Sequence, residues 1–235
     1  MIIAATGDVH SPRYFDEYVR AVDELQVKPQ LFLITGDMVH RGVLAEYEKI
    51  YNVLFGRISC PIVACFGNNE FEEIRAQLKR KYPTIRFLDD QSVILRANYT
   101  TVGIVGTTGS LETPTPWQRR NIPNIERLYV ERVDLVRRHL ERMIVEFKIV
   151  LMHYAPTYKT LEGENPRFYS SMGWNVYENV LTQQKPDLVV HSHSHRGKKM
   201  AWVNTVPVFN VSLPLNREIV VIDTAKLKPG LSKFV

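Results

Sequence analysis

The chain has 235 residues, of which 45% are apolar and 10% aromatic, so it can bury one large core, and we expect a single domain over residues 1–235. Its 30 Lys and Arg against 25 Asp and Glu give a formal charge of +5, which suits anionic ligands but is too small for a dedicated nucleic-acid binder. No stretch has the pattern of a signal peptide or a membrane span, which excludes those classes and favours a soluble protein.

Short apolar runs rich in β-branched residues recur along the chain and predict buried strands at residues 2–6, 31–35, 61–66, 100–107, 148–152 and 187–191. Between several of them, helical spacing of apolar side chains predicts helices at residues 14–25, 44–54 and 124–147. This alternation is typical of an α/β protein. Cys60 and Cys65 flank the third strand, about 16 Å apart and beyond disulfide reach, so we expect the reducing cytoplasm.

The C-terminal part of the chain has a different pattern. Residues 206–214 and 217–224 form two further predicted strands with no helix between them, so this part of the sheet system is expected to be antiparallel or mixed. Residues 226–235 are compatible with a loose tail or with a docked edge.

Polar residues of the metal-ligand type stand where several of these predicted strands end. In chain order they are Asp8, His10, Asp37, Asn68, His153, His191, His193 and His195. In an open α/β sheet the carboxyl ends of the strands gather at one edge, where ligands usually bind. We therefore expect these side chains to converge.

Each piece has a plainer explanation when it is taken alone. Asp8 and His10 could be a helix cap and a chance histidine, and the HSHSH run could be a cap or a chance surface cluster. Alternation along an extended segment would instead point His191, His193 and His195 to one face. Five strand-end positions occupied in order favour a metal site.

At these positions the chain resembles the calcineurin-like metallophosphoesterase superfamily, and its small prokaryotic phosphodiesterase branch in particular. The superfamily motifs Asp-x-His, Gly-Asp, Gly-Asn-His-Asp/Glu, His and Gly-His-x-His correspond here to residues 8–10, 36–37, 67–70, 153 and 192–195. The resemblance implies two packed mixed β-sheets flanked by helices, an αββα sandwich. It also implies two metal ions, one held by Asp8, His10, Asp37 and His195 and the other by Asp37, Asn68, His153 and His193.

These residue types suit the chemistry that the resemblance implies. Two divalent ions about 3.5–4 Å apart need a bridging carboxylate, here Asp37, and borderline ions accept mixed oxygen and imidazole ligands. We expect Mn, with Fe, Zn or Ni as alternatives. A hydroxide bridging the ions would attack phosphorus in line, so no serine or cysteine nucleophile is needed.

One position departs from the superfamily pattern. Where a histidine usually contacts the phosphate and protonates the leaving group, this chain has Asn69, whose amide donates hydrogen bonds but delivers no proton. General acid catalysis is worth roughly 10² to 10⁴ in rate. Asn69 therefore either selects diesters or marks reduced activity. The residues around Asn69 also have expected roles. We expect Gly67 to permit the turn that follows the strand at residues 61–66, and Glu70 to begin the next helix.

Two further residues are candidates for the catalytic set. Arg41, in the sequence GDMVHRG, resembles the phosphate-binding arginine of protein Ser/Thr phosphatases, although it could equally be a loop arginine in solvent. His191 matches no ligand position, and it is either a supporting or substrate contact or a structural histidine.

Segments 107–121 and 154–174 are the expected rims of the site. Trp117 with Arg119 and Arg120 could stack on a base and hold phosphate, as a nucleotide diester requires, or Trp117 and Trp174 could be hydrophobic anchors. We expect a dinuclear metal-dependent phosphodiesterase. The alternatives are a phosphomonoesterase or protein phosphatase, and a weakly active metal-binding interaction module. The expected partner is a phosphoester, with no membrane; nucleic-acid binding and the oligomeric state are left open.

Overall fold

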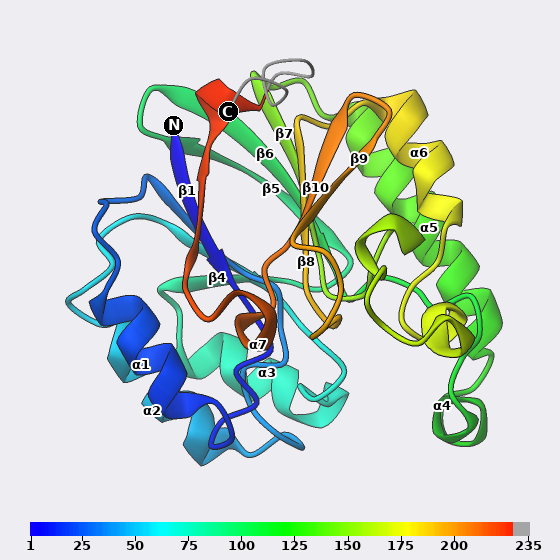
Figure 1. Ribbon diagram of the computed structural model, residues 1–235, viewed down its shortest axis with the longest axis horizontal. Coiled ribbons are helices and arrows are strands. Elements are labelled where there is room, and N and C mark those ends of the chain that lie inside the picture. Colours follow the sequence, from blue (N-terminus) through cyan, green and yellow to red (C-terminus); the bar gives the residue numbers. More distant parts are fainter. Residues whose placement is uncertain (228–235) are drawn as a thin grey trace.

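The strands form two mixed β-sheets in the computed structural model, which describes residues 1–227 (Figure 1). The five-stranded sheet has the order β11-β1-β2-β3-β4, with bounds Val220–Asp223, Ile2–Thr6, Leu31–Ile34, Ile62–Cys65 and Ile85–Leu88. The strands β1 to β4 are parallel, and β11 pairs antiparallel with β1. The sheet is therefore mixed, as predicted.

The second sheet has six strands in the order β5-β6-β7-β8-β10-β9. Their bounds are Gln91–Ala97, Thr100–Thr107, Phe147–Met152, Leu188–His191, Val206–Asn210 and Met200–Val203. The four central strands are parallel, and the edge strands β5 and β9 pair antiparallel with their neighbours. Both sheets thus bring the carboxyl ends of their parallel strands to the lower edge in Figure 1.

Helices cover the outer face of each sheet. The five-stranded sheet is covered by α1, α2 and α3, with bounds Phe15–Asp23, Leu44–Leu54 and Glu72–Lys81. The six-stranded sheet is covered by α5 (Ile125–Arg142) and α6 (Val176–Gln184). Two short helices, α4 (Pro116–Asn121) and α7 (Leu213–Asn216), lie in connections. This order of layers confirms the predicted αββα sandwich.

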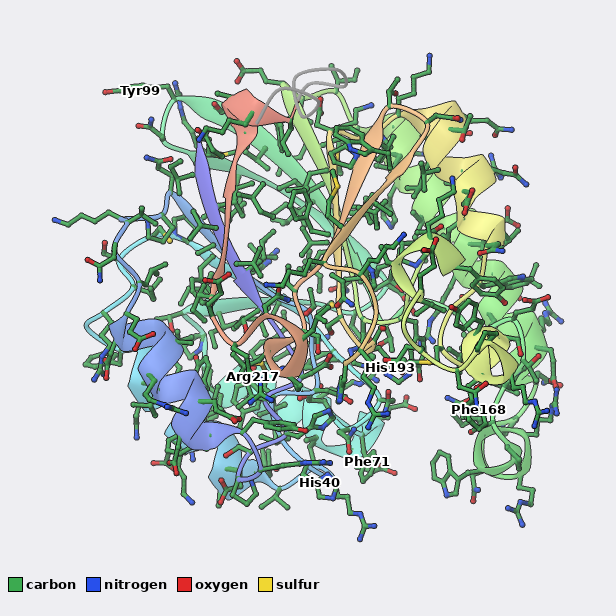
Figure 2. All side chains as sticks on the ribbon, in the orientation of Figure 1. His40, Phe71, Tyr99, Phe168, His193 and Arg217 are labelled. Atoms are coloured by element: carbon green, nitrogen blue, oxygen red, sulfur yellow. The ribbon has the colours of Figure 1, made fainter. Side chains whose placement is uncertain are left out.

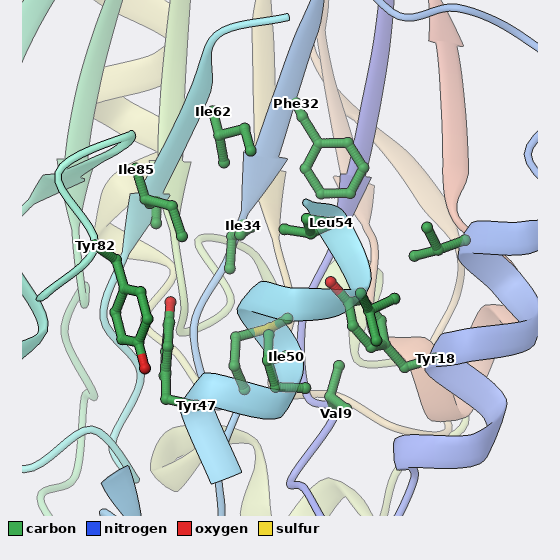
Figure 3. Packing of buried hydrophobic residues seen from close by; sticks show 14 of the residues in the cluster. Val9, Tyr18, Phe32, Ile34, Tyr47, Ile50, Leu54, Ile62, Tyr82 and Ile85 are labelled. Carbon is green, nitrogen blue, oxygen red and sulfur yellow. The ribbon is translucent and has the colours of Figure 1, made fainter. Parts of the chain in front are cut away.

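Alternation of side chains along the buried strands produces two apolar layers per sheet. In β2, Phe32 and Ile34 face α1 and α2, as Figure 3 shows, whereas Leu31 and Leu33 face the other sheet. Within residues 1–227, the layer between the sheets consists mainly of such inward strand residues. Strands that are apolar on both faces are what the continuous sequence runs predicted.

The helix predicted over residues 124–147 is too long. Helix α5 ends at Arg142, and Phe147 begins β7, where it pairs with Val102 of β6. Met143 and Phe147 fit a helical spacing, but they pack in different places. Met143 is buried against Gly103 at the helix end, and Phe147 is half-buried between the sheets. Pairing with β6 outweighs the helical pattern.

Other predicted boundaries also shift. Helix α7 lies between β10 and β11, where no helix was expected. Strands β4, β5 and β9 were not predicted at all, and β5 is an edge strand with a mixed burial pattern. The alternatives for the tail concern residues 226–235, of which 228–235 lie outside the described residues. Within the described part, Cys60 and Cys65 are free thiols, and no helix is both long enough and apolar enough to cross a bilayer.

Candidate metal centre

The carboxyl ends of both sheets bring the predicted ligands together. Two groups have ligand atoms that all lie within 4.8 Å of one another: Asp8, His10 and His195 form the first, and Asp37, His153 and His193 the second. Asn68 joins the second group, since its Oδ1 lies 3.0 Å from Nε2 of His153. All seven predicted ligands are therefore placed at one site.

Asp37 lies between the two groups. Its Oδ2 is 3.8 Å from Nε2 of His10 in the first group and 3.6 Å from Nε2 of His153 in the second. The carboxylate is 1% exposed. Asp8 approaches the second group through its Oδ1, which lies 3.8 Å from Nδ1 of His153. A single oxygen of Asp37, Oδ2, therefore lies near Nε2 of one histidine in each group. Asp8 does not have this arrangement, since its Oδ1 lies near Nδ1 of His153.

The backbone is bent sharply at these strand ends. Asp8, His10, Asp37 and His193 all have left-handed φ, between 44° and 69°. Asp and His tolerate this region better than most residues, but each such position still costs on the order of 1 kcal/mol or more. Strained positions that cluster in this way are typical of functional sites, where the surrounding structure enforces them.

Glu70 is the clearest example of that enforcement. Its carboxylate is 1% exposed and accepts hydrogen bonds from the backbone N–H groups of Gly67 (2.8 Å), Asp37 (2.8 Å) and Met38 (2.7 Å). Glu70 thus ties the loop after β2 to the loop after β3. The prediction that Glu70 begins the next helix is wrong, because α3 begins at Glu72 and these loop amides, which no strand satisfies, take the carboxylate instead.

The glycines of the two loops are required by close approach. A Cβ on Gly67 would lie 2.2 Å from Oδ1 of Asp37, and one on Gly36 would lie 2.2 Å from the backbone nitrogen of Gly67. Only Gly36 also has a left-handed φ. Gly67 therefore makes room for the Asp37 carboxylate, which is a different reason from the turn that the sequence suggested.

Burial sets the charge state of the imidazoles. It lowers the pKa of His153 and His193 below the ordinary value, and it lowers the pKa of His10 to about 4. Burial also lowers the pKa of His195, but the hydrogen bond and negative charge of Asp8 more than offset this and raise it. Neutral imidazoles are the form that binds metal ions.

The two buried carboxylates are driven in opposite directions. Burial raises the pKa of Asp37 to about 7, and the negative charge of Asp8 adds to this shift. Burial would also raise the pKa of Asp8, but the hydrogen bond of His195 and the nearby imidazoles hold it well below its ordinary range. Two carboxylates this close repel each other unless positive charge lies between them.

Two polar contacts in the site are incomplete without a cation. The Oδ1 atom of Asp8 is buried and has no hydrogen-bond partner. The Thr35 carbonyl, which can only accept, lies 3.0 Å from Nδ1 of His153 and so fixes the proton there. The lone pair of Nε2 then faces Oδ1 of Asn68 at 3.0 Å, an arrangement of two acceptors that suits a shared metal ion. The residues present therefore fit divalent metal ions.

Asn69 lies directly on Asp37. Its side-chain Nδ2 donates to Oδ2 of Asp37 (2.6 Å), its backbone N–H donates to Oδ1 of Asp37 (2.7 Å), and its own Oδ1 accepts from the backbone N–H of Arg41 (3.1 Å). Arg41 is exposed. It does not line the groove of about 750 Å³ that opens beside Asn68 and His193. The predicted roles of Asn69 and Arg41 toward phosphate stay predictions.

His191 is separated from the ligand groups. The strand β8 ends at His191, and the left-handed φ of 69° at His193 breaks the alternation that would have kept the three histidines on one face. His191 is fully buried, its Nδ1 lies 2.8 Å from the Ser192 carbonyl, and its Nε2 has no partner. Its side chain is therefore not exposed to solvent, and the predicted supporting or substrate contact of His191 stays a prediction.

Replacing His191 with asparagine tests a purely structural role. Burial lowers the pKa of His191 to about 4, so as pH falls from 6.5 to 4 the unfolded chain binds a proton that the folded chain refuses, and the free energy of unfolding drops by up to about 1.4 kcal/mol per pH unit. In denaturant titrations between pH 6.5 and 4, the free energy of unfolding of the variant should therefore fall less steeply with pH than that of the wild type. An unchanged pH slope would contradict this explanation.

The structure also places residues to which the sequence assigned no role. His40 is exposed, with its ring centroid 6.4 Å from that of His10. A groove of about 750 Å³ opens beside Asn68 and His193. Figure 2 shows His193, His40 and Phe71 at the same end of the molecule. Both predicted rim segments, 107–121 and 154–174, contribute residues to this groove, but its other walls come from segments far apart in the chain that no local sequence signal connects.

The two predicted rim tryptophans differ. Trp117 lines the groove and is 57% exposed, so it is not an anchor, whereas Trp174 is half-buried and packs against the core under α5 and α6. Arg119 contacts Glu126, and Nε of Arg120 donates to the Pro116 carbonyl. Neither arginine lines the groove, so the predicted phosphate contact beside Trp117 stays a prediction that this arrangement does not favour.

The sandwich of two mixed sheets with two carboxylate and histidine groups at one edge defines a metallophosphoesterase. The family model described as calcineurin-like phosphoesterase matches residues 1–197, and the chain belongs to this family. Membership of this family indicates a hydrolase that acts on phosphoesters, and the family uses divalent metal ions. A comparison with curated proteins gives no match.

Solved structures share the fold at low sequence identity. Phosphopantetheinyl hydrolase from Mycobacterium tuberculosis is similar with a TM-score of 0.68 at 14% identity, over 89% of this chain and 88% of that one. The protein TT1561 from Thermus thermophilus has a TM-score of 0.62 at 15% identity, over 95% and 98%. GAP50, the anchor in the inner membrane complex of Plasmodium, has a TM-score of 0.58 at 12% identity, over 91% and 72%.

Proposed function

We propose that the protein is a dinuclear metal-dependent phosphodiesterase. The observation that carries this proposal is the position of the Asp37 carboxylate between two ligand groups. Asp8, His10 and His195 would hold one ion and Asn68, His153 and His193 the other, with Asp37 shared. When bound, such ions supply a nucleophile from water at neutral pH and neutralise charge on the phosphoryl oxygens. Mn is the proposed metal, since the donor set mixes oxygen with imidazole.

The remaining residues orient these ligands. The carbonyl of Thr35 and the hydroxyl of Ser192, at 3.0 and 3.2 Å from Nδ1, fix the ring of His153. Oδ2 of Asp8 accepts from the backbone N–H of His193 at 2.7 Å, which ties the histidine loop to the end of β1. Orienting groups of this kind keep a site in geometry and contribute to metal affinity.

The preference for diesters rests on Asn69 and on the groove. The amide of Asn69 can donate a hydrogen bond to a phosphoryl oxygen but delivers no proton, so it suits a diester whose leaving group departs without protonation. The groove beside His193 leaves space for a second ester substituent, which a monoester lacks. We also propose a reducing compartment, since both cysteines are free thiols.

The test is metal-dependent hydrolysis of bis(p-nitrophenyl) phosphate. Protein treated with a chelator should be inactive, and added Mn²⁺ should restore turnover. The rate on bis(p-nitrophenyl) phosphate should exceed the rate on p-nitrophenyl phosphate at equal metal loading. A faster monoester reaction would favour a phosphomonoesterase. If no phosphoester is cleaved with Mn, Fe, Zn or Ni while the metals still bind, the protein is an interaction module and the proposal fails.

A further inference from the structure

The groove beside the metal centre is much larger than a phosphate needs. Its volume of about 750 Å³ lies in the range of pockets that bind whole small organic molecules. It begins at Asn68 and His193 and runs between the start of α3 and the segment formed by α4 and α5. A ligand whose phosphate lies at the metal centre would therefore extend its organic part into this groove.

Aromatic and aliphatic side chains form both walls. Phe71 stands before α3 and is 40% exposed, and Trp117 in α4 is 57% exposed. Among residues 1–227, neither ring stacks on another aromatic ring. Ile122 and Leu128 add aliphatic surface on the Trp117 side. Partly exposed aromatic rings at a groove can stack on a flat substituent.

The charges of the groove disfavour further anionic groups. Its two guanidinium groups are each neutralised: Nη1 of Arg75 lies 2.8 Å from Oδ1 of Asp89, and Nε of Arg132 lies 2.8 Å from Oδ2 of Asp90. Glu72 and Glu73 also line the groove, and within the described part of the chain neither is in an ion pair. A second phosphate placed here would meet carboxylates without a free cation.

We propose that this groove binds the larger substituent of the substrate, and that it selects a phosphodiester whose substituent is flat, aromatic or apolar and carries no further negative charge. A nucleoside held through its single diester phosphate fits this description, and a nucleic-acid strand or a polyphosphate does not. The inference rests on the proposed function and adds the substrate class to it.

The test compares three substrates with one leaving group: methyl p-nitrophenyl phosphate, thymidine p-nitrophenyl phosphate, and the latter with a second phosphate on its sugar. In each, an oxygen from water bonds to phosphorus, nitrophenolate leaves with the electron pair, and the proton from water goes to solvent. We expect the thymidine compound to be the best substrate, and the second phosphate to lower kcat/KM.

Substitution of Trp117 tests the groove itself. Trp117→Ala should raise KM for the thymidine compound by at least about fivefold and leave the methyl compound unchanged, while Trp117→Phe should keep stacking and KM. Phe168→Ala is the matched control, since Phe168 is 58% exposed but does not line the groove. The double change Glu72→Gln and Glu73→Gln should raise kcat/KM for the thymidine compound that carries the second phosphate, and not for the other two substrates.

Several results would overturn the proposal while leaving phosphodiesterase activity intact: equal effects of Trp117→Ala on the thymidine and methyl compounds, or a preference for the second phosphate. If no diester is cleaved, the proposed function fails. A binding measurement with an uncleaved diester then tests separately whether the groove holds the organic substituent. The methyl ester of thymidine phosphate should quench tryptophan fluorescence of the metal-loaded wild type but not of Trp117→Phe, and no quenching would overturn the proposal.

Discussion

Asp37→Asn will lower the diesterase activity by about 10³-fold or more. The Asp37 carboxylate lies between the two ligand groups, and the amide that replaces it has no negative charge and only one oxygen. The variant should still fold, since asparagine has the same size. Initial rates on bis(p-nitrophenyl) phosphate with Mn²⁺, together with metal content after gel filtration, measure the effect. We expect the metal content per chain to fall as well.

Asp187→Asn is the matched control. Asp187 precedes β8 at the opposite end of the sheet, where its Oδ2 accepts from the backbone N–H of Lys148 at 2.7 Å. The amide oxygen of asparagine can still accept that bond, so the change should cost at most about 1 kcal/mol of unfolding free energy and no activity. An Asp37→Asn variant with the activity of Asp187→Asn would show that Asp37 is a buried structural acid and would rule out the dinuclear site.

Asn69→His will raise monoesterase activity relative to diesterase activity, by about tenfold or more, because the imidazole can protonate a poor leaving group. The change also removes the hydrogen bond from Nδ2 of Asn69 to Oδ2 of Asp37, so some loss of diesterase activity is expected. Parallel rates on p-nitrophenyl phosphate, an alkyl monoester and bis(p-nitrophenyl) phosphate give the ratio.

Asn69→Ala separates the two effects, since it removes the hydrogen bond without adding an acid. It should lower both activities and leave their ratio close to that of the wild type. If Asn69→His behaves like Asn69→Ala, the residue does not select diesters, and reduced activity becomes the better explanation of the amide at this position.

The ligand positions could be predicted because they depend on local rules. Asp8, Asp37 and Asn68 each follow a buried parallel strand, and parallel strands end at one edge. The family resemblance carried by the order of the motifs then implied the sandwich. The absence of a predicted helix between the last two strands implied an antiparallel or mixed part, but the pairing of β11 with β1 was not predicted.

What could not be predicted depends on contacts between distant segments. His191 and His193 are two residues apart, yet the left-handed backbone at His193 sends one into the interior and the other to the site. Glu70 has a sequence position suited to a helix start, but the unsatisfied amides of another loop bind it. The boundary at Phe147 depends on its pairing with Val102. The amides of that other loop, which bind Glu70, and the strand residue that pairs with Phe147 all lie far from these residues in the sequence.

Each of the two ligand groups takes residues from both sheets. Asp8 and His10 follow a strand of the five-stranded sheet and His195 follows one of the six-stranded sheet, and the second group divides in the same way between Asp37 and the histidines 153 and 193. A bound ion is therefore a cross-link between two layers that otherwise meet through apolar contacts and through hydrogen bonds at this edge, such as the one from the backbone N–H of His193 to Asp8. Neither half of the chain, expressed alone, contains a complete site, and metal binding should make the two sheets unfold as one cooperative unit.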